Sequence, residues 1–131
     1  MRLVDVYTDP ESKDFLWRLL AQRPPQANIS HRKMPTWQEH CNFVDSRPYL
    51  YWYLIDCGDY VGAVYLSKQR EIGIGVLAQF WGHGYGKSAI QMLMAKHPGR
   101  FLANVAPGNR VSIELFADMG FRHVQQTYEL P

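Results

Sequence analysis

The sequence predicts a single α/β domain over residues 1–131, built on a mixed, mostly antiparallel sheet flanked by helices. The chain is long enough to bury one sizeable core, because 47% of its 131 residues are apolar and only 20% are charged. Three strand-like runs follow one another in the middle of the chain, separated by short turns, as in an antiparallel meander. Helices and strands alternate after them, which is the order of an α/β fold.

The amino-terminal segment is predicted to form a strand and then a helix. Apolar and polar residues alternate over 3–7, which is typical of a strand. Aspartate is favoured at the N-cap and proline at the first position of a helix, so Asp9 and Pro10 predict where the helix begins. Apolar residues then recur with helical spacing until Pro24 and Pro25, where we expect the helix to have ended.

A second, short helix is predicted to begin after Thr36. Thr36 and Glu39 have the spacing of a capping box, in which each side chain binds a backbone amide that the helix leaves free. The helix should end before Pro48. Its expected apolar stripe consists of Trp37, Cys41 and Val44, with His40 on the same side.

The meander is predicted from three runs rich in β-branched and aromatic residues. Residues 49–55 contain no polar interruption, which favours a strand that is covered on both faces. Residues 60–66 and 71–76 follow after short polar turns. Gly73 and Gly75 are unexpected inside a strand and predict a bulge or a close approach of another backbone.

The second half of the chain is predicted to alternate helix and strand. We expect helices over 86–96 and 109–119 and strands over 101–105 and 121–128. Counting from 3–7, residues 71–76 form the fourth predicted strand and 101–105 the fifth. The two glycines of the fourth strand predict that it splays away from the fifth.

Composition excludes several classes of protein. A formal net charge of +2 is too small for the concentrated basic face that nucleic-acid binding requires. No apolar run approaches the ~20 residues that span a bilayer, and the first residues do not resemble a signal peptide. Cys41 and Cys57 have no metal-like spacing. We therefore expect a cytoplasmic protein without membrane, nucleic-acid or metal binding.

A glycine-rich segment, residues 79–87, joins the third run of the meander to the next helix. Glycines at every second position from Gly82 to Gly86 leave backbone amides exposed at a helix amino terminus, where an anion such as pyrophosphate binds. A Walker loop would need glycine at position 81, which is Trp81, so we expect no Mg²⁺-dependent ATP binding. The spacing of a dinucleotide-binding fingerprint is also absent.

The segments around this loop complete a family pattern. Residues 71–76 precede it, and 109–121 follow it with Asn109, Ser112 and Gly120-Phe121 in the positions of the family's helix motif. From residue 71 to 121 the chain resembles the GNAT superfamily of acyl-CoA-dependent N-acetyltransferases. Within this superfamily, the chain resembles the branch of ribosomal-protein amino-terminal acetyltransferases and, more faintly, that of nucleotide-amino-sugar acetyltransferases. The resemblance implies a GNAT-like sheet that is splayed between strands 4 and 5.

The resemblance implies acetyl-CoA as the co-substrate. In the family the glycine loop binds the pyrophosphate, an amide of the fourth strand polarises the thioester carbonyl, and the helix after the fifth strand lies along the pantetheine arm. The residues so implied to bind acetyl-CoA are Ile74, Gly75, Val76, Gly82, His83, Gly84, Tyr85, Gly86, Lys87, Asn109 and Ser112.

The resemblance also implies catalytic roles. Glu71 opens the fourth strand, where family members often hold a general base. Phe116 stands where many members carry a tyrosine that protonates the leaving thiolate, which leaves Ser112, Tyr128 or water as the acid. The alternative bases lie before the meander: His31 and His40.

The predicted acceptor is a primary amine of a small molecule or of a nucleotide-linked amino sugar. The alternatives are a protein amino-terminal acetyltransferase and a catalytically silent CoA-binding module that acts through a partner. A homodimer is compatible with the resemblance.

Overall fold

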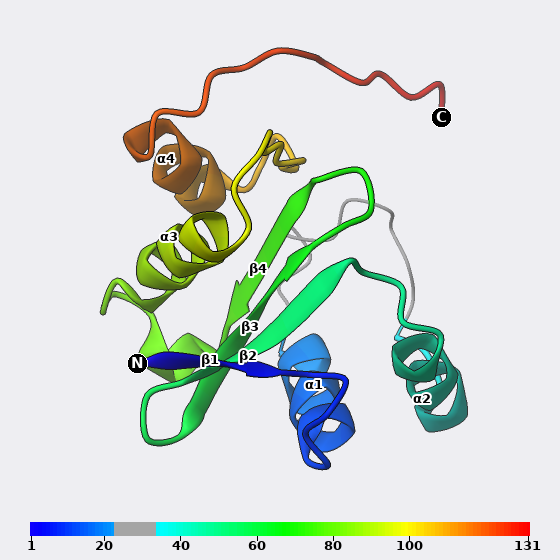
Figure 1. Ribbon diagram of the computed structural model, residues 1–131. Helices are drawn as coiled ribbons and strands as arrows, with labels where there is room; N and C mark the ends of the chain where they lie inside the picture. Colours follow the sequence, from blue (N-terminus) through cyan, green and yellow to red (C-terminus); the bar gives the residue numbers. More distant parts are fainter. Residues whose placement is uncertain (23–33) are drawn as a thin grey trace.

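A four-stranded antiparallel sheet organises the computed structural model, which describes residues 1–22 and 34–131 (Figure 1). The strand order is β1-β2-β3-β4, so each strand pairs with its neighbour in sequence and the predicted meander is confirmed. The elements are, in order, β1 (Arg2–Asp5), α1 (Ser12–Ala21), α2 (Trp37–Asp45), β2 (Tyr51–Asp56), β3 (Tyr60–Leu66), β4 (Ile72–Val76), the 3-10 helix η2 (Ala78–Phe80), α3 (Tyr85–Lys96) and α4 (Arg110–Asp118).

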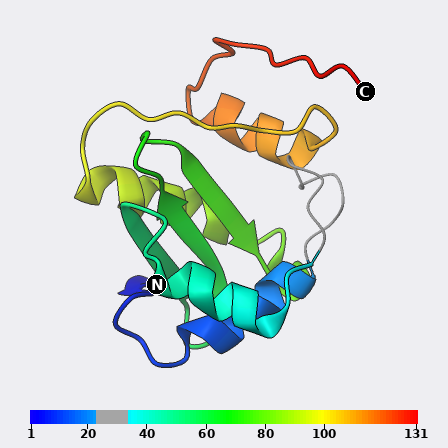
Figure 2. The same cartoon turned by 90° about the vertical axis from the view of Figure 1, so that its right-hand side faces the viewer.

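Helices cover both faces of the sheet. Helices α1 and α2 lie on one face, and α3 lies on the other with α4 beside it (Figures 1 and 2). Strand residues alternate between these faces, so Leu54 packs with the α1 side and Ile55 with the α3 side, both fully buried. Burial on both faces explains the apolar run within β2, whereas Leu50, just before the strand, is 43% exposed.

The prediction of a strand at 101–105 is wrong, because only Leu102 of this segment pairs with the sheet. A single parallel bridge joins it to Glu71. The Ile72 amide donates to the Leu102 carbonyl at 2.7 Å, and the Leu102 amide donates to the Arg70 carbonyl at 3.0 Å. The segment therefore meets β4 at one end only, in agreement with the predicted splay.

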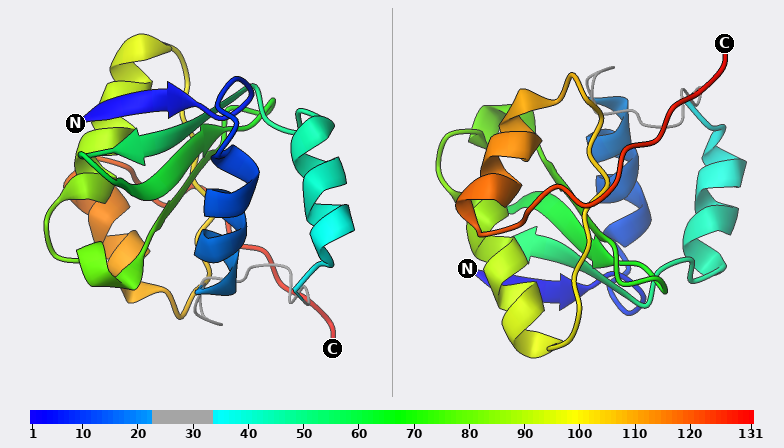
Figure 3. Two further views of the ribbon diagram at one scale, coloured as in Figure 1. Left: turned by 90° about the horizontal axis from the view of Figure 1, so that it is seen from below. Right: turned by 90° about the horizontal axis from the view of Figure 1, so that it is seen from above.

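The predicted terminal strand at 121–128 is also wrong. Residues 122–131 are exposed and have no regular secondary structure, and from α4 they pass across above the sheet without joining it (Figures 1 and 3). A strand is stable only where a neighbouring strand accepts its hydrogen bonds, and none of the described strands lies beside this segment. The local sequence pattern does not supply that neighbour.

The first helix begins later than predicted. Its N-cap is Glu11, without a side-chain bond, and the helix proper starts at Ser12. The Asp9 carboxylate accepts a hydrogen bond from the Glu11 amide at 3.1 Å, and Tyr60 also donates to it, so Asp9 forms the turn before the helix. The prediction of Asp9 as N-cap with Pro10 in the first helical position is therefore wrong.

The capping box of α2 is confirmed. The Glu39 amide donates to the Thr36 hydroxyl at 3.2 Å, and the Thr36 amide donates to the Glu39 carboxylate at 2.9 Å. Hydrogen bonding to Thr36, chiefly to its backbone amide, lowers the pKa of the Glu39 carboxyl. The predicted stripe holds only in part, because His40 and Val44 are buried whereas Trp37 is 44% exposed.

Candidate active site

The loop before α3 presents a row of free backbone amides. Among the described residues, none accepts a hydrogen bond from the amides of residues 82–87. Gly82 and Gly84 have φ of 82° and 76°, a left-handed conformation that glycine adopts without strain. Amides so exposed at the amino terminus of a twelve-residue helix attract an anion.

The charge around the loop also favours an anion. Residues 72–113 contain no Asp or Glu, whereas they contain Lys87, Lys96, Arg100 and Arg110. Lys87 is exposed in the first turn of α3, beside the free amides. No carboxylate within this stretch therefore opposes a phosphate at the helix terminus.

Trp81 ties the loop to the end of β4. Its indole N–H donates to the Val76 carbonyl at 2.8 Å, while the residue stays 58% exposed. The side chain therefore binds the protein backbone and adds no charge to the loop.

The outer edge of β4 is open beyond Ile72. Since N–H groups of alternate strand residues point to the same side and that of Ile72 points to Leu102, those of Ile74 and Val76 also face away from β3. None of the described strands pairs with this edge. It offers hydrogen-bond donors next to the amide loop.

The glycines of β4 do not mark a bulge, so this half of the expectation is wrong, whereas the backbone of Gly75 does approach that of Gly62 on β3 closely. The β3 and β4 registers run without a shift from Leu66↔Ile72 to Gly62↔Val76. Gly73 is required for another reason, because a β-carbon there would overlap the ring of Tyr65 on β3. A β-carbon on Gly75 would only touch Leu19 of α1, at 3.4 Å.

The family's helix motif forms the start of α4. Asn109 is the N-cap, and its side-chain oxygen accepts a hydrogen bond from the Ser112 amide at 3.2 Å. Ser112 is half-buried. Phe116 is 6% exposed and packs edge-on against Phe121, so this position of α4 is part of the core and carries no hydroxyl.

The proposed catalytic residues lie far apart. Glu71 is half-buried just before β4, at the opposite end of this strand from the amide loop. Tyr128 is 84% exposed in the terminal segment. His40 is buried, with its Nε2 2.9 Å from the Lys13 carbonyl, which gives it a structural role between α2 and α1. His31 lies outside the described residues.

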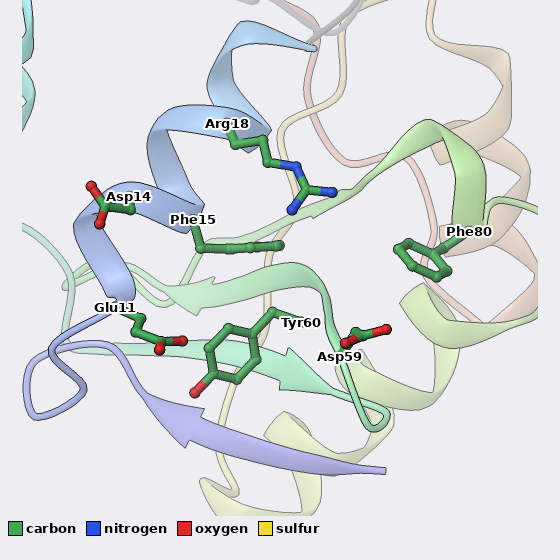
Figure 4. Close-up of a pocket in the computed structure, with 7 residues that line it drawn as sticks. All are labelled: Glu11, Asp14, Phe15, Arg18, Asp59, Tyr60 and Phe80. Carbon is green, nitrogen blue, oxygen red and sulfur yellow. The ribbon is translucent and has the colours of Figure 1, made fainter.

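Two pockets are lined by residues other than 82–87. One, of about 500 Å³, lies between α1 and the start of β3 (Figure 4); it is lined by Glu11, Asp14, Phe15, Arg18, Asp59, Tyr60 and Phe80. Hydrogen bonding to Asp9 raises the pKa of Tyr60 to about 12. The other, of about 320 Å³, lies where β2 begins, beside Tyr7 and Arg47. Neither pocket is lined by a residue predicted to bind acetyl-CoA, so the free amides and the open edge of β4 form the candidate site.

Sequence reasoning did not single out Tyr65, which the structure places against β4. Its ring lies across Gly73 in the middle of β4, next to the Ile74 amide. A strand glycine can reveal such a ring, but only once the register of the two strands is known.

Known proteins identify the family. The sequence model of the acetyltransferase (GNAT) family matches residues 13–121, so the chain belongs to this family. No curated protein matches the sequence significantly. None of the described helices is long and apolar enough to cross a membrane.

Solved structures share the fold. A domain from Methanocaldococcus jannaschii DSM 2661 matches with a TM-score of 0.78 at 19% identity, over 98% of this chain and 92% of that chain. The ribosomal-protein-alanine N-acetyltransferase of Brucella melitensis matches with 0.73 at 15%, over 95% and 86%. The yncA protein of Salmonella typhimurium, solved with its cofactor acetyl-CoA, matches with 0.66 at 17%, over 92% and 77%. The predicted GNAT-like fold is confirmed.

Proposed function

We propose that this protein is a single-domain N-acetyltransferase that moves an acetyl group from acetyl-CoA to a primary amine. The acceptor is a small molecule or a nucleotide-linked amino sugar. The observation that carries the proposal is the row of free amides at 82–87, which adjoins the open edge of β4 in a stretch without carboxylates. Family membership supports the same reaction.

The amide loop and β4 would hold the acetyl donor. Amides of 82–87 suit a pyrophosphate, with Lys87 adding a positive charge. The open N–H groups of Ile74 and Val76 suit carbonyl oxygens, and one of them would stabilise the negative charge that develops on the thioester oxygen. Asn109 and Ser112 at the start of α4 would border the pantetheine arm.

Glu71 would act as the general base. An amine attacks only through its free lone pair, so the reaction needs a group that takes the proton from the nitrogen. In the described residues, the Glu71 carboxylate has no hydrogen bond or ion pair, and it lies on the strand that would hold the thioester. A water between Glu71 and the amine would complete the path.

Release of the CoA thiol from acetyl-CoA, measured against a panel of amines, tests the proposal. The panel should include amino sugars, nucleotide-linked amino sugars and peptides with free amino termini. Turnover that depends on one class of amine identifies the acceptor. Absence of both CoA binding and turnover would contradict the proposal.

Two other functions have specific support. The similarity to the Brucella melitensis enzyme favours a protein amino terminus as the acceptor, and peptide substrates in the panel test it directly. The buried Phe116, which lacks a hydroxyl, favours a silent CoA-binding module. Tight CoA binding without turnover on any amine would support that module.

A further inference from the structure

Tyr65 of β3 lies across β4, with its phenol hydroxyl against the backbone of Gly73. The two residues are partners in the β3–β4 register. A β-carbon on Gly73 would overlap ring carbons of Tyr65 as well as its hydroxyl oxygen. Because Gly73 has no side chain, the phenol ring of Tyr65 can lie directly on the backbone of β4.

Aromatic packing fixes this ring. Tyr49 stacks on Tyr65 with ring centroids 3.7 Å apart and planes 3° from parallel. Trp52 packs edge-on against Tyr49 at 4.7 Å. With Gly73 on one side and this stack on the other, the hydroxyl of Tyr65 is held in one place, as a catalytic group must be.

The hydroxyl is also free to act. Tyr65 is half-buried, and its hydroxyl forms no hydrogen bond with the described residues. The tyrosine hydroxyls of Tyr7, Tyr53 and Tyr60, in contrast, each have a partner. Because a phenol removed from water usually finds a hydrogen-bond partner, the open hydroxyl of Tyr65 is suited to a ligand.

The hydroxyl of Tyr65 lies against Gly73, next in sequence to Ile74 of the proposed acetyl site. Ile74, the next residue of β4, presents its N–H to the open edge of the strand. Tyr65 reaches the same point of β4 from the face covered by α1, because Tyr65 packs with the cluster on that side. One hydrogen-bond donor and one proton donor therefore converge on neighbouring residues of β4.

We propose that Tyr65 is the catalytic acid of the acetyl transfer, an inference that rests on the proposed function. The amine nitrogen forms a bond to the thioester carbonyl carbon, and the C–S bond breaks with its electron pair on sulfur. Tyr65 gives its phenol proton to that sulfur, and Glu71 takes the proton that the nitrogen loses. Proton transfer from Glu71 through water to the phenolate restores both groups, so one acetyl group and one proton are exchanged.

Tyr65→Phe tests this role because it keeps the ring over Gly73 and the stack on Tyr49. We expect kcat to fall about 100-fold, at the low end of general acid–base catalysis because a thiolate leaves readily. The calorimetric Kd for acetyl-CoA and the melting temperature should stay at the wild-type values.

Tyr51→Phe is the matched control. Its hydroxyl likewise forms no hydrogen bond with the described residues, and its ring stacks on His97, on the α3 side of the sheet. This variant should keep the wild-type kcat. It separates loss of a particular hydroxyl from the general effect of replacing a strand tyrosine.

Each other result contradicts the inference. A wild-type kcat in Tyr65→Phe, or a weaker affinity for acetyl-CoA with unchanged kcat, overturns the role of Tyr65 alone. A loss of kcat in Ser112→Ala or Tyr128→Phe but not in Tyr65→Phe assigns the acid to those residues. If the wild-type protein releases no thiol with any amine, the proposed function fails, and this inference fails with it.

Discussion

Replacing Gly84 by valine tests the amide loop by backbone strain alone. Gly84 is the N-cap of α3 with φ of 76°, and a β-carbon there would meet nothing within 4 Å. The left-handed conformation costs an L-residue about 1–2 kcal/mol, and a β-branched side chain makes it a genuine outlier. We therefore expect the loop of Gly84→Val to leave its present conformation.

The expected effect on binding follows from that strain. If the free loop relaxes, an anion can bind to the aligned amides only after the strained conformation has been restored. A cost of about 1–2 kcal/mol weakens binding about 5- to 30-fold. Gly86 is less suitable for this test, because a β-carbon there would lie 3.6 Å from Ile74 and 3.8 Å from Val76. Larger side chains would disturb the packing of α3 on β4.

Calorimetry with CoA and with pantetheine distinguishes the loop from the rest of the site. Pantetheine lacks the pyrophosphate, so its affinity should not change in Gly84→Val, whereas that of CoA should fall. Gly58→Val is the control, since Gly58 has φ of 101° and open space in the β2–β3 turn. It should lose stability and keep the wild-type affinity for CoA. An affinity for CoA within twofold of wild type in Gly84→Val would refute a phosphate-binding role of the loop.

Three further variants test the core and the chemistry. Gly73→Ala should lower the free energy of unfolding by about 1–3 kcal/mol, measured by urea denaturation, because the new methyl group overlaps Tyr65; the loss should shrink in a Tyr65→Ala background. Burial lowers the pKa of His97 in the folded protein, and the charges of Lys96 and Arg70 lower it further. The folded protein therefore binds a proton at His97 less readily than the unfolded chain does. We expect the free energy of unfolding to fall as pH drops below about 6.5, the ordinary histidine pKa. Denaturation of His97→Gln should show a smaller loss between pH 7.5 and 5; an equal loss would assign it to another group. Glu71→Gln should lower the acetylation rate most at neutral pH and less at high pH, where the free amine is abundant; a wild-type rate at every pH would exclude Glu71 as the base.

Local interactions made part of the fold predictable. The capping box of Thr36 and Glu39 spans four residues, so its bonds are present in the structure as the sequence predicts. The meander joins strands through short turns, and neighbouring strands in sequence then pair. The exposed amides of 82–87 follow from glycine spacing alone, because left-handed residues at Gly82 and Gly84 need no distant contact.

Features that depend on distant partners were not predictable in this way. The segment 101–105 has strand-like residues, yet it pairs only through Leu102 because it diverges from β4 after one bridge. The reason for a glycine at position 73 was likewise not predictable from the residues around it. Its sequence neighbours favour a bulge, whereas its actual cause is the ring of Tyr65, which comes from another strand. In both cases the deciding atoms belong to residues that the local pattern does not contain.

The two ends of β4 explain why its middle is suited to a ligand. At one end the Ile72 amide is bound to Leu102, and at the other the Val76 carbonyl is bound to the indole of Trp81. Between them the outward polar groups of Ile74 have no strand beside them in the described chain. A strand edge left open between two closed ends favours an extended ligand that carries its own amides, as peptides do when they add to a sheet. Pantetheine has two amide groups, so the pantetheine arm of acetyl-CoA suits this window while the pyrophosphate of the same molecule reaches the amides of 82–87. The same geometry would bring the thioester beneath the hydroxyl of Tyr65.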